Sequence, residues 1–353
     1  YVPQLQKWYL RLYDVTQADL NWDHPKVCEE LKEILRFWKG KGIQGFRFDV
    51  INLVSKPERM EDDFEGDGRR FYHIHEYLKE LVKDAGIEDY ITVGEMSSTS
   101  LEHCIRYSAP SEKELSMCFN FHHLKVDYKD GDKWALDTVD YKKLKELFIE
   151  WQTGMQKGNG WNALFWCNHD QPRIVSRMGD ENVYWKESAK MLAGMIHLMR
   201  GTPYIYQGEE IGMLNAHYPS IGQYRDVESL NYYEILLAEG KTEEEALAVL
   251  SARSRDNSRT PMQWNNGTYA GFSQAEPWLA VSAAFWEEIT VEAQQQEDDS
   301  ILAFYKQLIK IRKRYPAIAK GDISFLETGA DMVIAYQRTL GEQHMVLGNK
   351  PKI

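Results

Sequence analysis

The stretch Gly45-Phe-Arg-Phe-Asp-Val-Ile-Asn52 decides the fold that this chain is expected to adopt. Its apolar residues run up to Asp49 and are interrupted by Arg47, a pattern typical of a short buried strand that ends on a charged side chain. A helical pattern precedes it and begins with the start signals Asp23 and Pro25. A helix followed by a short buried strand predicts one repeat of an α/β fold with a parallel sheet.

The same alternation continues along the chain. We expect strands at about residues 90–94, 117–121, 163–166 and 203–206, and helices at about residues 74–84, 141–156, 185–200, 242–252 and 300–314. Thr242 and Glu245 form a capping-box pattern at the start of one of these helices. Two strand-like runs, 332–336 and 344–347, have no helix between them, so a small β-rich unit is expected near the C-terminal end.

Composition excludes several classes of function. The 353 residues include 42 Lys and Arg against 54 Asp and Glu, a formal charge of −12. This balance argues against nucleic acid, which requires a basic face, and against an anionic membrane surface. No apolar run reaches the roughly 20 residues that span a bilayer, and no Cys-x-x-Cys pair is present, so reduced cytoplasmic thiols are expected. Aromatic residues, at 12%, are compatible with stacking on sugar rings, although core packing explains most of them.

Three acidic residues stand where an expected strand meets its loop: Asp49, Glu95 and Asp170. Catalytic groups of α/β barrels lie at this end of the strands. A single aspartate there is more often a helix cap, but three in one chain favour a site. Paired carboxylates suit glycoside hydrolysis, in which one attacks the anomeric carbon and the other donates a proton to the leaving oxygen.

Arg47 lies two residues before Asp49, so both side chains point to the same face of the strand. A cation there would keep Asp49 ionised, as a nucleophile requires; a plain structural ion pair is the alternative. Glu95 has apolar neighbours, Val93 and Met96, and no adjacent Lys or Arg. That setting favours a carboxyl group that holds its proton.

Four stretches together resemble the α-amylase superfamily of retaining glycoside hydrolases, in its oligo-1,6-glucosidase-like branch. They are Gly45-Phe-Arg-Phe-Asp-Val-Ile-Asn52, Val93-Gly-Glu-Met96, Asn168-His-Asp-Gln-Pro-Arg173 and Arg255-Asp-Asn-Ser-Arg-Thr-Pro-Met-Gln-Trp264. The resemblance implies an α/β fold, a (β/α)8 TIM barrel that lacks its N-terminal strands in this chain and is followed by a small C-terminal β domain. It also implies double displacement, with the two reacting carboxyl groups about 5–5.5 Å apart.

The resemblance also implies roles for matching residues. The carboxylates are Asp49 as nucleophile, Glu95 as general acid/base and Asp170 as the third carboxylate, which binds sugar hydroxyls and favours the distorted ring. Arg47 would lie beside the nucleophile, and His169 and Arg255 would contact the transferred glucosyl unit. No cofactor is implied, apart from a structural calcium ion in the N-terminal part of the family's barrel.

Two further stretches, 94–99 and 119–128, resemble the trehalose-6-phosphate hydrolases of this branch. They imply cleavage of this phosphorylated disaccharide to glucose and glucose-6-phosphate, in the cytoplasm. The substrate's phosphate requires cationic contacts. The candidates for contacts with the phosphate are Lys125, Arg69, Arg70 and Lys56, for which solvated surface positions are the alternative. His122 or His123 is the candidate for the sugar pocket.

Compared with the family, the chain begins just before the fourth barrel strand. We therefore expect residues 1–320 to form a partial barrel, with the tail of an inserted domain at 1–22, and residues 321–353 to begin a C-terminal β-sandwich. An acidic partner of Arg255 is expected in the part that is missing. The polypeptide by itself is expected to be inactive, and the function belongs to the longer enzyme.

Other functions stay open at this point. An oligo-1,6-glucosidase would apply the same chemistry to an uncharged substrate. A non-catalytic relative, such as the ectodomain of an amino-acid transporter heavy chain, is disfavoured by the three intact carboxylates. A carbohydrate-binding module would explain the aromatic residues but not the carboxylates at the strand ends.

Overall fold

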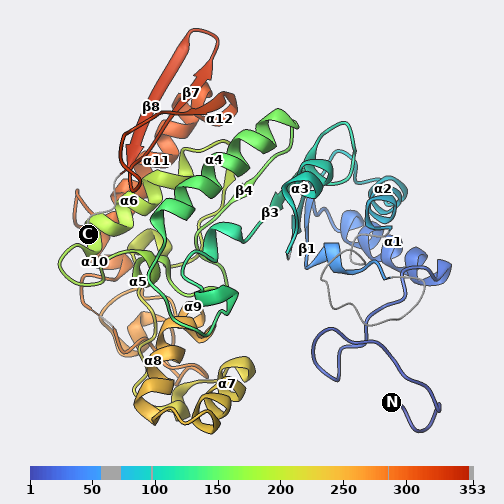
Figure 1. The fold of residues 1–353 in the computed structure, drawn as a ribbon, viewed down its shortest axis with the longest axis horizontal. Helices are drawn as coiled ribbons and strands as arrows, with labels where there is room; N and C mark the ends of the chain where they lie inside the picture. Colours follow the sequence, from blue (N-terminus) through green and yellow to red (C-terminus); the bar gives the residue numbers. More distant parts are fainter. Residues whose placement is uncertain (57–72, 97, 285, 350–353) are drawn as a thin grey trace. The chain divides into compact units, whose positions relative to one another are not determined.

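A computed structural model describes residues 1–56, 73–96, 98–284 and 286–349 (Figure 1). The chain divides into two compact units. The first contains residues 1–121 and 154–163, and the second contains residues 122–153 and 164–353. Each unit is described by itself below.

The first unit is built on a parallel sheet in the order β1 (Gly45–Phe48), β2 (Ile91–Glu95) and β3 (Met117–Phe119). Helices α1 (Pro25–Gly40), α2 (Ile74–Asp84) and α3 (Leu101–Ser108) connect with these strands (Figure 1). Leu35 of α1 packs with Leu81 and Val82 of α2 in one apolar cluster. Helix, strand, helix and strand therefore alternate as the sequence predicts.

The remaining elements follow in chain order. The helices are α4 (Tyr141–Lys157), α5 (Ile174–Met178), α6 (Trp185–His197), α7 (Val227–Ala238), α8 (Glu243–Arg253), α9 (Asp256–Arg259), α10 (Val291–Gln295), α11 (Ile301–Arg314) and α12 (Pro316–Lys320). Strands β4 (Ala163–Leu164) and β5 (Thr202–Pro203) pair with each other.

The second unit ends in an antiparallel sheet of β6 (Asp322–Phe325), β7 (Ile334–Leu340) and β8 (Gln343–Asn349). Two buried β7 side chains join this sheet to the end of α6. The Tyr336 hydroxyl donates to the Met195 carbonyl at 2.9 Å, and Arg338 Nη1 donates to the Leu198 carbonyl at 2.8 Å. The expected β-rich unit at the C-terminal end is therefore present and is packed on a helix.

Most expected elements lie where the sequence places them, and the Thr242–Glu245 capping box at the start of α8 is confirmed. One cap differs from the expectation. The N-cap of α1 is His24, whose ring accepts from the Lys26 amide, while Asp23 accepts the Tyr77 hydroxyl. Asp23 therefore bonds to Tyr77 of α2 and does not cap α1. In the described part of the chain, no helix is long and apolar enough to cross a membrane.

Candidate active site

Asp49 directly follows β1, at the end where the parallel strands finish. Arg47 pairs with Val93 in the sheet and Phe48 pairs with Gly94, so the next register position sets Asp49 beside Glu95. Residues two apart share a face of a strand, and therefore Arg47, Asp49 and Glu95 all face the same side. Val50 then adopts a left-handed conformation with φ of 35°, which turns the chain away from the sheet.

Glu95 is the last residue of β2, and its side chain is 12% exposed, against 70% for Asp49. The neighbouring Gly94 fits because it has no side chain. A Cβ there would lie 2.4 Å from Met96 Cε and 2.6 Å from Leu115 Cδ1. The glycine thus allows Met96 and Leu115 to pack tightly beside Glu95. The Glu95 carboxylate is mostly buried, whereas the Asp49 carboxylate is exposed.

Arg47 joins the two carboxylates. Its Nη1 lies 2.7 Å from Asp49 Oδ1, and its Nη2 forms an ion pair with Glu95 Oε2. The predicted contact of Arg47 with Asp49 is present. The sequence favoured a Glu95 carboxyl group that holds its proton, and the cation beside it in the structure opposes this. The neighbours of Glu95 in the sequence are apolar, whereas the guanidinium reaches it from the adjacent strand.

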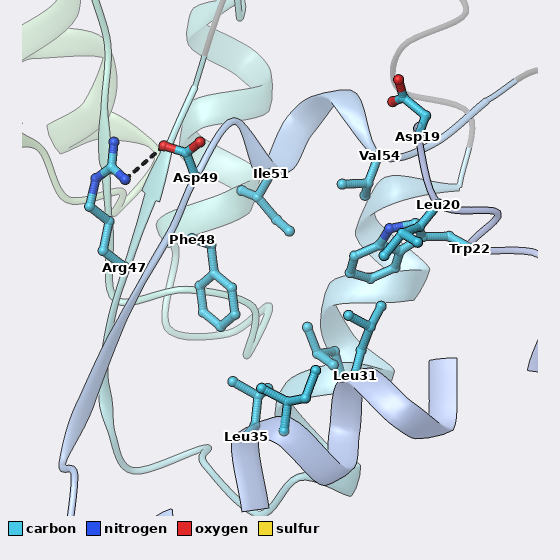
Figure 2. Close-up of a pocket in the computed structure, with 12 residues that line it drawn as sticks. Asp19, Leu20, Trp22, Leu31, Leu35, Arg47, Phe48, Asp49, Ile51 and Val54 are labelled. Carbon is cyan, nitrogen blue, oxygen red and sulfur yellow. Dashed lines mark hydrogen bonds and ion pairs between the residues drawn. The ribbon is translucent and has the colours of Figure 1, made fainter. Parts of the chain in front are cut away.

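A cavity of about 360 Å³ opens beside these groups (Figure 2). Its charged lining residues are Arg47 and Asp49, joined by the ion pair drawn in Figure 2, and Asp19, which lies apart from them. Apolar side chains from α1 and from the segment before it, such as Leu31 and Trp22, line much of the rest. The nucleophile candidate therefore faces open space.

The second unit holds a separate cluster around Asp170, which lies in the turn between β4 and α5. Asp170 Oδ1 is 2.6 Å from Arg259 Nη2 and 3.6 Å from Arg255 Nη1, and Oδ2 is 3.3 Å from His169 Nε2. The structure thus brings together the three predicted residues Asp170, His169 and Arg255. It adds Arg259, which the sequence analysis did not single out.

Arg255 has acidic partners within its own unit. Its Nη2 lies 2.9 Å from Asp226 Oδ1 and its Nε lies 3.3 Å from Glu228 Oε2. Burial lowers the pKa of Arg255, but Asp226, Glu228 and Asp170 outweigh this effect and raise it. The sequence led us to expect an acidic partner of Arg255 in another part of the family's barrel. Asp226 and Glu228 are partners that the sequence did not predict. The Asp226 carboxylate lies 29 positions before Arg255 in the sequence, and no local pattern links the two.

The other predicted contacts have different surroundings. His123 is 6% exposed, and its Nε2 donates to the Phe165 carbonyl at 2.8 Å. Burial lowers the pKa of His123 to about 4, which favours a neutral ring, and its role in the sugar pocket stays a prediction. Lys125 is exposed. Arg69 and Arg70 lie outside the described residues.

Arg259 could have been found from a spacing already present in the sequence. Arg255 and Arg259 are four residues apart, and side chains at this spacing lie on one face of a helix. Arg255 is the N-cap of helix α9 and Arg259 is its last residue, and both arginines contact Asp170. No group of three or more His, Cys, Asp or Glu suited to a metal ion occurs among the residues that the structure describes.

Comparison with known proteins agrees with the motifs. Residues 2–321 match the family description "Alpha amylase, catalytic domain". The chain is 50% identical over 348 residues to the trehalose-6-phosphate hydrolase of Bacillus subtilis, covering 97% of this chain and 62% of that protein. It is 42% identical over 361 residues to the oligo-1,6-glucosidase of Bacillus cereus, covering 99% of this chain and 64% of that protein.

Solved structures agree as well. The crystal structure of Bacillus licheniformis trehalose-6-phosphate hydrolase is 52% identical and superposes with a TM-score of 0.92, covering 97% of this chain and 62% of that one. The isomaltulose synthase of Klebsiella sp. LX3 is 33% identical with a TM-score of 0.90, covering 98% of this chain and 63% of that one. These similarities confirm the expected TIM-barrel fold with a C-terminal antiparallel sheet. The chain spans less than two thirds of the length of these relatives.

Proposed function

Since this chain belongs to the α-amylase family of glycoside hydrolases, we propose that the enzyme carrying it cleaves trehalose-6-phosphate into glucose and glucose-6-phosphate with retention. The observation that carries the proposal is the pair Asp49 and Glu95, set side by side on adjacent strands with Arg47 bound to both. The substrate is supported by the 50% identity to a relative named for this activity.

In the first step, an ionised Asp49 oxygen attacks the anomeric carbon of the unphosphorylated glucosyl unit, while Glu95 protonates the bridging oxygen. The carbon–oxygen bond breaks and glucose-6-phosphate leaves. Arg47 holds the Asp49 carboxylate in place before the attack, through the contact of Nη1 with Oδ1 at 2.7 Å. Since Glu95 Oε2 faces Arg47, the transferred proton would come from Oε1.

In the second step, Glu95 takes a proton from water, and that water attacks the anomeric carbon of the ester with Asp49. Glucose is released and both carboxyl groups return to their first state. The contact of Arg47 with Glu95 suits this step, because the guanidinium stabilises the ionised form that acts as base. Two carboxylates supply all the proton and bond changes, so the proposed reaction uses no metal or cofactor.

Asp170, His169 and Arg255 are proposed to bind the glucosyl unit. A carboxylate that accepts sugar hydroxyls supports the distorted ring of the transition state, and Asp170 Oδ2 is the oxygen less engaged by arginine. For the phosphate we propose Lys125, which is exposed, with Arg69 and Arg70 as further candidates. Cations of this kind form charge-assisted hydrogen bonds with phosphate oxygens.

The runner-up is an oligo-1,6-glucosidase, which the 42% identity to the Bacillus cereus protein supports. The two activities share the chemistry and differ in whether the leaving sugar carries a phosphate.

We also propose a cytoplasmic location, because all four cysteines are free and reduced thiols are characteristic of that compartment.

A comparison of substrates on the longer enzyme tests the proposal. We expect kcat/KM for trehalose-6-phosphate to exceed the values for trehalose and isomaltose by at least about 100-fold, roughly 3 kcal/mol of transition-state binding. Asp49→Asn should lower kcat for every cleaved substrate by at least about 1000-fold, since it removes the nucleophile. Lys186→Met is a control on a partly exposed ion pair with Glu297 and should leave kcat unchanged.

Three outcomes would contradict the proposal in different ways. Preference for isomaltose would assign the enzyme to the runner-up. Normal hydrolysis of trehalose-6-phosphate by Asp49→Asn would show that another group is the nucleophile. Inversion of the anomeric configuration, followed by NMR of the released glucose, would exclude double displacement.

A further inference from the structure

One arginine from a distant part of the chain binds both the backbone and a side chain of the turn that contains His169 and Asp170. Arg259 Nη2 donates to Asp170 Oδ1 at 2.6 Å, and Arg259 Nε donates to the His169 carbonyl at 2.7 Å. The guanidinium presents its donors in a fixed planar fork. Two donors of that fork on neighbouring residues therefore determine both the position of the turn and the direction of the carboxylate.

Asp170 needs such support because its own segment holds it weakly. It lies in a turn, its side chain is 32% exposed, and its amide donates to Asn168 Oδ1 at 2.8 Å. A partly exposed aspartate can occupy several staggered rotamers unless its partners select one. The bond from Arg259 restrains Oδ1 and leaves Oδ2 on the side of His169.

The element that carries Arg259 is rigid. The three residues before it, Asp256, Asn257 and Ser258, are fully buried. Asn257 Oδ1 accepts from the Ala216 amide at 2.9 Å, and the Ser258 carbonyl accepts from Arg173 Nη2 at 3.1 Å. Functional groups held by such supported elements keep their geometry better than groups on loops. Helix α9 thus provides a fixed base from which Arg259 reaches the turn.

The two arginines near Asp170 differ in which carboxylates they contact. Arg255 is shared with Asp226 and Glu228, and it stands 3.6 Å from Asp170. Within the described part of the chain, Arg259 forms its ion pair with Asp170. Arg259 is therefore closer to the Asp170 carboxylate than Arg255 is. Among the described ion pairs, Arg259 is also not shared with a second carboxylate.

We propose that Arg259 is a positioning residue for the reaction, which orients Asp170 so that Oδ2 meets the hydroxyls of the distorted sugar. The inference rests on the proposed glycoside hydrolysis and adds a residue that acts through another. Asp170 binds the ring most strongly when the ring is distorted, so its misplacement raises the energy of the transition state more than that of the bound substrate. The loss should consequently appear in kcat and not in KM.

The test compares Arg259→Met and Arg259→Lys in the longer enzyme, with trehalose-6-phosphate and with an uncharged aryl α-glucoside. Arg259→Met should lower kcat about 100-fold for both substrates, the cost expected of a misplacement by about 1 Å, and change KM less than about threefold. Arg259→Lys keeps a cation near Asp170 but cannot bond the His169 carbonyl with the same fork. It should recover about tenfold of the lost kcat.

Arg36→Met is the matched control. Arg36 also joins a carboxylate and a backbone carbonyl, with Nη1 at 2.7 Å from Glu29 Oε1 and Nη2 at 2.8 Å from the Asp84 carbonyl. It lies on α1, apart from the Asp170 cluster in the sequence and in the other compact unit. We expect this variant to keep kcat, and both Met variants to melt within a few degrees of the wild type.

Three results would overturn the proposal. A lowered melting temperature with kcat per folded enzyme unchanged would make Arg259 merely structural. A raised KM for trehalose-6-phosphate alone would make it a phosphate contact. Full recovery of kcat in Arg259→Lys, which lacks the planar fork, would remove the fork from the explanation. If the wild type cleaves the aryl glucoside but not trehalose-6-phosphate, the proposed substrate is wrong. The kcat test on the aryl glucoside then still decides the role of Arg259. If the wild type cleaves neither substrate, the proposed function and the proposed role of Arg259 are both overturned.

Discussion

At the scale of single residues, Arg47 shows how one side chain can serve two carboxylates. The sequence placed it on the same face as Asp49, and the register of β1 with β2 brings Glu95 to its other nitrogen. The first relation follows from the two-residue period of a strand. The second required the neighbouring strand, and the apolar residues next to Glu95 in the sequence do not indicate it.

His123 provides a prediction on pH. Its pKa is lowered to about 4 by burial, whereas in an unfolded chain it is about 6.5. Between these values the unfolded state binds the proton and the folded state does not, so the free energy of unfolding falls as the pH is lowered from 6.5 to 4. The contribution of this residue is about 3 kcal/mol over that range, and it is fully present above pH 6.5.

Urea unfolding at several pH values measures this effect. His123→Phe keeps an aromatic ring in the core but cannot titrate, so its stability relative to the wild type should improve by up to about 3 kcal/mol between pH 6.5 and 4. Parallel curves for the wild type and His123→Phe would contradict a neutral buried ring.

At the scale of elements, Asp127 ties the segment after β3 to two helices. Arg177 of α5 binds both of its carboxylate oxygens at 2.7 and 2.8 Å, and Arg253 of α8 contacts Oδ2 at 2.5 Å. Although burial raises the pKa of Asp127, Arg177 and Arg253 outweigh it and lower the pKa below its usual value. The segment that carries Lys125 is therefore fixed by an ionised, buried side chain.

Asp127→Asn should destabilise the protein by about 4 kcal/mol, because it leaves two buried guanidinium groups without their anion. The folded pKa of Asp127 is depressed, so its contribution is present above about pH 4 and is lost as the pH falls through the folded value. Chemical unfolding at pH 7 measures the cost. Asp130→Asn changes an exposed aspartate in the same segment and should cost less than about 0.5 kcal/mol. Equal stability of the two variants would contradict this account.

Elements with strong local signals were predictable, and others were not. Helix α2 begins and ends at the predicted residues, 74 and 84, and α8 has its predicted capping box, because amphipathic spacing and caps are local properties. Helices α3 and α7 were missed. Helix α3 has only eight residues, and in α7 apolar residues surround the helix instead of forming one stripe, as Leu236 is buried while Ile235 is exposed.

At the scale of the whole molecule, buried arginine side chains hold the C-terminal sheet within the second unit. Arg338 of β7 is fully buried and donates to the carbonyls of Leu198, Gly321 and Asp322 at 2.8, 2.6 and 3.3 Å. These carbonyls lie just beyond α6 and at the start of β6, where the chain has backbone acceptors to satisfy. One side chain thereby links the sheet to the end of α6.

Arg338→Met should lower the free energy of unfolding by about 3 kcal/mol, since it leaves buried carbonyls without donors. Calorimetry or urea unfolding of the chain measures the loss. Arg314→Met removes an arginine that stacks on Tyr315 and should cost less than about 1 kcal/mol. If Arg338→Met is as stable as the wild type, the sheet is held by its apolar contacts alone.

The sequence by itself determined the alternating α/β pattern, the positions of Asp49 and Glu95 at strand ends, and the family, because periodicity, caps and motifs are encoded over short stretches. Tertiary structure alone decided which groups meet. It placed Arg47 on Glu95, His123 in the core, Asp226 on Arg255 and Arg259 on Asp170. Ion pairs depend on distance in space, which strand register and helix packing set, and Arg259 and Asp170, 89 positions apart, come within 2.6 Å only after folding.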